Sequence, residues 1–206
     1  MKILIFLLWA LHFVIADQTI ISLPQPQKTG GMPLMAALNN RQTQRAFSDK
    51  KLPLQLISNL LWAGCGINRE NGKRTAPSAV NWQEIDIYVA MDKGVYLYNP
   101  VKNQLELVLE KDIRKFTGKQ DFTDHCPLNL IYVADYTRMN TEKAKKDFYS
   151  ATDTGFISQN IYLFCASEGL ATVVIGAVNK IYLKEIMELN NDQHVILTQS
   201  VGYPAN

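Results

Sequence analysis

Hydrophobic residues in the middle of the chain come in short runs separated by turn signals. Runs rich in Val, Ile, Leu and Tyr predict strands at 85–90, 95–98 and 105–109. Turn sequences separate these runs, at Asp92-Lys93-Gly94 and at Asn99-Pro100. The pattern therefore predicts a β-meander of three strands.

Other apolar segments have different spacing. The run at 128–134 is continuous, which is typical of a buried strand. Helical spacing predicts helices at 34–40 and, after Pro53, at 54–64. The remaining elements are a long helix over 141–168 with a break near 152–155, a strand at 172–178, a helix at 183–189 and a strand at 194–201. We find no repeat and no linker, so these elements indicate one α+β domain.

The second half of the long helix, residues 156–170, is apolar on almost every side. A helix of this kind must bury most of its faces. In a domain this small, an interface between two subunits is a natural place for it. The pattern therefore favours a chain that forms dimers.

The first 16 residues resemble a targeting signal. A Lys follows Met1, an apolar run comes next, and the segment ends at Ala16. The run is shorter than the roughly 20 residues that span a bilayer, and its layout is typical of a secretory signal peptide. The alternative is an N-terminal helix packed in the core. We expect residues 17–206 to form the single domain, starting with an extended arm at 17–33 that its Pro and Gly residues keep irregular.

Cleavage after Ala16 predicts an exported protein, in a periplasm or outside the cell. No Cys follows the apolar run, so no stable membrane anchor is expected. If the segment is not cleaved, the prediction becomes a cytoplasmic protein.

Composition narrows the class of partner. Of 206 residues, 47% are hydrophobic and 19% are charged, which suits a folded core rather than a disordered chain. The net charge of +2 gives no electrostatic reason to expect nucleic acid. The three Cys and three His residues are scattered, so we predict neither a metal site nor a disulfide framework.

Four segments carry candidate chemistry. Arg41, Thr43 and Arg45 place two guanidinium groups around a hydroxyl, which suits a phosphate group. The alternative is a solvated loop.

The segment 153–160 puts Gln159 and Asn160 into an apolar helix, where they need hydrogen-bond partners. A structural role in bridging helices is the stronger interpretation there.

The other two segments are turns built from small residues. One turn follows Arg74 and contains Pro77, Ser78, Ala79 and Asn81, so that a backbone and an amide side chain can approach a flat ligand. In the second, Gly176 and Ala177 follow an apolar strand and expose backbone groups. Plain structural turns are the alternative for both. No nucleophile with a neighbouring base is visible, so we assign no catalytic side chain.

Taken together, the order of these segments resembles the FMN-dependent nitroreductase superfamily across residues 34–204. The matching patterns are R-x-S/T-x-R at 41–45, P-S-x-x-N-x-Q at 77–83, D-x-G-x-x-x-Q-N at 153–160, G-L…I-G at 169–176 and the closing V-G-Y-P at 201–204. Within the superfamily, the chain is most similar to the branch that includes azoline (thiazole/oxazole) dehydrogenase modules. It lacks that branch's Lys-Tyr pair and the basic residues that commonly follow G-Y-P.

The resemblance implies a nitroreductase-like fold, with a central, mostly antiparallel sheet flanked by helices. It also implies a homodimer with FMN at the interface and a small-molecule substrate. Arg41, Thr43 and Arg45 would hold the FMN phosphate and the pyrimidine edge of the ring, with Arg74 contributing. Pro77, Ser78, Ala79 and Asn81 would reach the flavin from the partner subunit, and Gly176 and Ala177 would face N5.

The implied activity is hydride transfer through flavin N5, with ping-pong exchange between an NAD(P)H-type donor and a second substrate. Two alternatives stay open. One is a flavin-binding protein without turnover, and the other is an oxidising enzyme that consumes flavin or a small amine.

Overall fold

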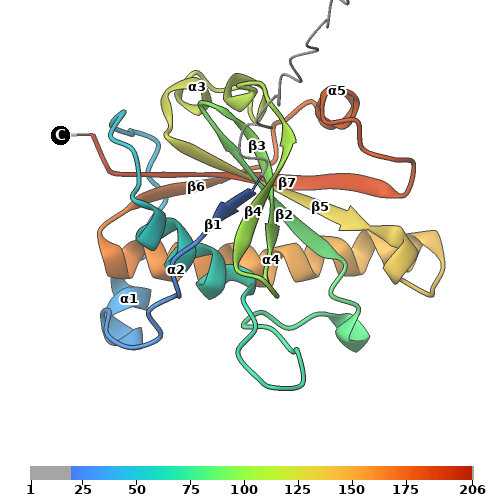
Figure 1. Cartoon of the computed structure of the whole chain (residues 1–206), viewed down its shortest axis with the longest axis horizontal. Coiled ribbons are helices and arrows are strands. Elements are labelled where there is room, and N and C mark those ends of the chain that lie inside the picture. Colours follow the sequence, from blue (N-terminus) through green and yellow to red (C-terminus); the bar gives the residue numbers. More distant parts are fainter. Residues whose placement is uncertain (1–19, 206) are drawn as a thin grey trace, which may run out of the picture.

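The computed structural model describes residues 20–205, so the predicted signal peptide lies outside the described residues. Its centre is one seven-stranded sheet of order β1-β4-β3-β2-β5-β7-β6, in which each neighbouring pair is antiparallel (Figure 1). The strands are β1 (Ile20–Ser22), β2 (Ile85–Met91), β3 (Gly94–Asn99), β4 (Gln104–Leu109), β5 (Leu128–Asp135), β6 (Ala171–Ile175) and β7 (Gln193–Gly202).

Helices cover both faces of the sheet (Figure 1). The long helix α4 (Lys143–Glu168) crosses beneath the strands, and α1 (Leu34–Asn40) and α2 (Leu54–Cys65) lie on the same side. The short helices α3 (Phe122–His125) and α5 (Lys180–Ile186) lie on the opposite side. The predicted α+β class, with a sheet flanked by helices, is confirmed.

Alternation along β5 shows how one strand supports two cores. Leu128, Leu130 and Tyr132 pack into the cluster that also contains α2 and α4 residues. Ile131 and Val133 point the other way and pack with Leu183 of α5 and its neighbours. Because successive side chains of a strand point to opposite faces, the continuous apolar run is what a strand covered on both faces requires.

The strand predictions hold with two differences. The meander is β2, β3 and β4, as expected. The arm at 17–33 is not wholly irregular, because β1 pairs with β4 and the Asn103 side chain donates to the Pro24 carbonyl at 2.8 Å. The strand predicted to reach residue 178 stops at Ile175, since Val178 N–H turns back to the Gly176 carbonyl at 2.9 Å.

The predicted break at 152–155 is wrong, because α4 runs without interruption from Lys143 to Glu168. Two hydroxyl groups inside it bond to the helix's own backbone, whereas the buried Thr154 hydroxyl has no hydrogen-bond partner within residues 20–205. The Thr152 hydroxyl donates to the Phe148 carbonyl at 2.9 Å, and the Ser158 hydroxyl donates to the Gly155 carbonyl at 3.1 Å. Helix α5 begins three residues earlier than predicted, because the Asn179 side chain caps it by accepting from Tyr182 N–H.

Two general features also bear on function. Within residues 20–205, no helix is long and apolar enough to cross a membrane. Cys65, Cys126 and Cys165 are all buried free thiols. Burial raises the pKa of each thiol, which disfavours the reactive thiolate.

Candidate functional site

The segment 41–45 leaves the end of α1 and runs beside β6. Gln44 N–H donates to the Thr172 carbonyl at 3.1 Å, which fixes the segment to the sheet edge. The Thr43 and Tyr162 hydroxyls lie 3.1 Å apart, and the Arg41 guanidinium lies over the Tyr162 ring at 5.4 Å from its centroid. We call residues 41–45 the arginine arm.

Both guanidinium groups of the arginine arm are available to an anion. Arg41 is half-buried and Arg45 is exposed. Within residues 20–205, neither of them forms an ion pair. A guanidinium group presents parallel donors that match phosphate oxygens. The structure thus brings the three predicted phosphate residues together on one segment with uncompensated positive charge.

Tyr162 organises this end of the site, and sequence reasoning missed it. Its hydroxyl accepts from Val174 N–H at 3.0 Å while also contacting Thr43, so it joins α4, β6 and the arginine arm. One tyrosine in an apolar helix carries no sequence signal for such a role.

Replacing Tyr162 with phenylalanine should destabilise the chain by about 1–2 kcal/mol, because Val174 N–H loses its acceptor. Urea unfolding measures this change. Tyr182→Phe is the matched control, since Tyr182 lies on α5 and is partly exposed. An equal effect of the two changes would refute the joining role of Tyr162.

The second cluster is the turn at 77–83. Ala79–Asn81 form a 3₁₀ turn, which the Ser78 hydroxyl supports by accepting from Gln83 N–H at 2.9 Å. Asp153 on α4 holds the turn from beneath, because its Oδ2 accepts from Ala79 N–H at 2.8 Å. The Val80 side chain projects outward and is 82% exposed. We call residues 77–83 the flavin turn, after the role predicted for it.

Arg74 lies with the flavin turn. Its Nη1 donates to the Cys65 sulfur at 3.0 Å and to the Ile85 carbonyl at 3.4 Å. Arg74, Ser78 and Asp153 line one small cavity, whereas the cavity beside the arginine arm is lined by a different set of residues. Within one chain the structure therefore does not bring Arg74 together with Arg41 and Arg45.

Gly176 and Ala177 follow the end of β6 and are exposed. The Ala177 carbonyl accepts from Lys119 N–H at 3.0 Å, and the Gly176 carbonyl accepts from Val178 N–H at 2.9 Å. A Cβ atom added at Gly176 would meet only the Leu197 side chain, at 3.7 Å. The fold of the chain itself therefore leaves room beside this backbone, in agreement with a ligand that approaches closely.

Helix α4 carries both clusters but holds them apart. Asp153 supports the flavin turn and Tyr162 supports the arginine arm. Nine helical residues span about 13 Å and two and a half turns, so these two side chains leave α4 on opposite sides. The two predicted binding segments, which we call the half-sites, therefore lie on different sides of α4 within one copy of the chain.

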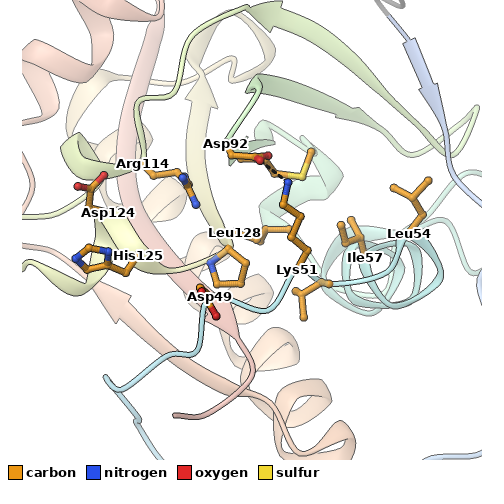
Figure 2. A pocket seen from close by; sticks show the side chains of 12 residues that line it. Asp49, Lys51, Leu54, Ile57, Asp92, Arg114, Asp124, His125 and Leu128 are labelled. Carbon is orange, nitrogen blue, oxygen red and sulfur yellow. Dashed lines mark hydrogen bonds and ion pairs between the residues drawn. The ribbon is translucent and has the colours of Figure 1, made fainter.

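A further cavity of about 330 Å³ lies elsewhere, near the start of α2 (Figure 2). Figure 2 shows Lys51 joined to Asp92, with Arg114 and His125 beyond Leu128. The Lys and Arg side chains of this cavity are already paired, Lys51 with Asp92 and Arg114 with Asp112. Because none of the predicted site residues lines it and its positive charge is compensated, it does not suit a phosphate.

Comparison with known proteins shows the family of this chain. Residues 38–203 match the family model described as the nitroreductase family. A nitroreductase homologue of Ralstonia eutropha has a crystal structure that superposes with a TM-score of 0.88, at 44% identity, covering 92% of this chain and 91% of that one. A nitroreductase homologue of Methanocaldococcus jannaschii is 29% identical over 90% of this chain and 97% of its own length.

More distant similarities extend the picture. The Bacillus subtilis protein named FMN reductase [NAD(P)H] is 22% identical over 84% of this chain and 66% of its own length. A chain of the E. coli microcin synthetase complex shares the fold with a TM-score of 0.69 at 19% identity, covering 87% of this chain and 76% of that one. Because the family model matches residues 38–203, most of the chain's length, the chain belongs to the nitroreductase family.

Proposed function

We propose that two copies of this chain bind FMN between the arginine arm of one copy and the flavin turn of the other, and use it to move hydride to or from a small organic substrate. The coarser statement, an FMN-dependent oxidoreductase, follows from the family and from the FMN reductase relative. The observation that carries the shared site is the placement of the half-sites on opposite sides of α4.

The residues present fit a phosphorylated flavin. Arg41 and Arg45 have uncompensated charge, and the Thr43 hydroxyl lies between them in the sequence, so the arginine arm would hold the phosphate. The exposed backbone of Gly176 and Ala177 would approach the ring where a side chain would interfere. Pro77, Ser78, Ala79 and Asn81 would contact the flavin from the partner.

Exposed apolar side chains on α1 and α4 support pairing with a second copy. Leu34 is 63% exposed, Met35 76%, Phe148 64% and Phe156 44%. Phe148 and Phe156 are eight residues apart and therefore share one face of α4. We call these four residues the α1/α4 surface. A second copy is the occupant that would complete each half-site while covering apolar groups that water solvates poorly.

The chemistry divides between cofactor and chain. When bound, FMN supplies a ring that accepts and donates hydride. The chain's residues bind and orient: guanidinium groups neutralise the phosphate, the flavin turn fixes the ring position, and the apolar helices exclude water. Because FMN would supply the reactive group, the predicted site residues need no nucleophile with a neighbouring base.

Spectroscopy of the purified protein tests the function. We expect a yellow protein whose flavin absorbance bleaches on anaerobic addition of NADH or NADPH and returns when an acceptor such as a nitroaromatic compound is added. A yellow protein that no donor reduces would instead favour a flavin carrier without turnover. A protein that takes up no FMN would contradict the proposal.

A further inference from the structure

Glu84 is a buried acid that the proposed function does not use. It connects the flavin turn to β2, and its side chain is fully buried. Within residues 20–205, neither carboxyl oxygen has a hydrogen-bond partner. A buried carboxylate without partners is costly, so burial raises the pKa of Glu84 from its ordinary value to about 7, and the neighbouring Asp153 raises it further in the same direction.

Asp153 links this acid to the flavin turn. Its side chain is also buried, at 2% exposure, and its Oδ2 is the acceptor for Ala79 N–H. The turn itself is strained, since Val80, Asn81 and Gln83 all have φ between 51° and 58° without being glycine. Such conformations persist only where surrounding contacts hold them. The bond from Ala79 to Asp153 is therefore one of the restraints that keep the turn in shape.

The other charged groups near Glu84 lie on several elements. Arg138 lowers the pKa of Glu84, but its guanidinium is bound to Asp86, to Asp135 and to the Gln83 carbonyl. Tyr136 and Cys65 also feel the charge of Glu84, and Arg74 donates to the Cys65 sulfur. Burial raises the pKa of both Tyr136 and Cys65, so neither supplies a charge near neutrality. Asp153 is thus the negative charge that Glu84 opposes when it ionises.

We propose that Glu84 and Asp153 form a proton-dependent clamp that positions the flavin turn for FMN. While Glu84 holds its proton, the pair carries one negative charge, which Ala79 N–H satisfies. When the proton leaves to solvent, two buried carboxylates repel each other and Asp153 loses its hold on the strained turn. Both are positioning residues, and the inference rests on the proposed flavin role of residues 77–83.

The sign of the pH dependence follows from the raised pKa. Between its ordinary pKa and about 7, Glu84 is protonated in the folded chain and ionised in the unfolded chain, so the clamp is intact in mildly acidic solution. It is lost as pH rises through about 7. FMN affinity should therefore be about tenfold weaker at pH 8.5 than at pH 6.

The test is a titration of the full-length protein with FMN at pH 6, 7 and 8.5, in which flavin fluorescence reports binding. Glu84→Gln keeps the shape and the neutral state, and should lack the loss of FMN affinity above pH 7 that the unchanged protein shows. Asp153→Ala removes the acceptor of Ala79 N–H and should bind weakly at every pH. Glu110→Gln, at an exposed position after β4, is the control for charge alone and should keep the pH dependence.

The phosphate of FMN also titrates near pH 6, but it contributes equally to all variants, so the comparison removes it. Infrared difference spectra of the unliganded protein between pH 5 and 9 provide a readout independent of flavin. They should show a protonated carboxyl group that titrates near neutrality and is absent from Glu84→Gln. If Glu84→Gln keeps the pH dependence, or the infrared signal is missing, the clamp is overturned. If no variant binds FMN at any pH, the proposed function fails as well.

Discussion

Replacing Arg41 with alanine should weaken FMN binding about a hundredfold. A guanidinium–phosphate pair of charge-assisted hydrogen bonds contributes on the order of 3 kcal/mol, which corresponds to that factor in Kd. Arg41 makes no ion pair within residues 20–205, so its removal leaves no buried acid unpaired and the fold should be retained. Isothermal titration calorimetry with FMN and with riboflavin, which lacks the phosphate, measures the effect.

The riboflavin comparison makes the assignment specific. Arg41→Ala should reduce the affinity for FMN far more than the affinity for riboflavin, because only FMN carries the phosphate. Lys102→Ala is the matched control, since it removes one positive charge from the exposed β3–β4 turn, near the other edge of the sheet. Unchanged FMN affinity in Arg41→Ala would refute the role of the arginine arm.

A charge on the α1/α4 surface should separate the two copies and release the flavin together. Phe156 is 44% exposed in one copy, so Phe156→Glu costs the folded single chain little. In a dimer, the new carboxylate would be buried against its counterpart without a partner, at a cost of several kcal/mol. We expect a folded monomer by light scattering, with FMN affinity reduced by at least a hundredfold.

Val108→Glu is the control for this second change. Val108 is 43% exposed on β4, away from the α1/α4 surface, so the same substitution there should leave both the dimer and the flavin in place. If Phe156→Glu became monomeric and still bound FMN tightly, one chain would be sufficient for binding. If it stayed dimeric, the α1/α4 surface would not be the interface.

Most of the fold can be predicted from local sequence patterns. The turn sequences between 85 and 109 predict the meander because each turn requires its own residue types, and those requirements act over a few residues. Errors arose where a tertiary contact overrides local preference. Thr152 and Gly155 suggest a helix break in isolation, yet the helix continues because it packs against α2 and against strands β2, β6 and β7.

The site divides in the same way. The arginine arm and the flavin turn are each one continuous stretch of sequence, so the residue types within each stretch can be recognised as a pattern. Tyr162 and Glu84 were missed because their roles depend on partners far away along the chain. Tyr162 meets a residue 119 positions distant, and Glu84 is opposed by an acid on α4. No local pattern marks either residue.

Sedimentation velocity with detection at 450 nm tests the central claim most directly, because it follows the flavin itself. The account predicts that bound flavin sediments only with a species of twice the chain mass, at close to one FMN per chain, and that dilution to monomer releases it. Flavin that sediments with single chains would contradict the account, since it would mean that one copy closes the site alone.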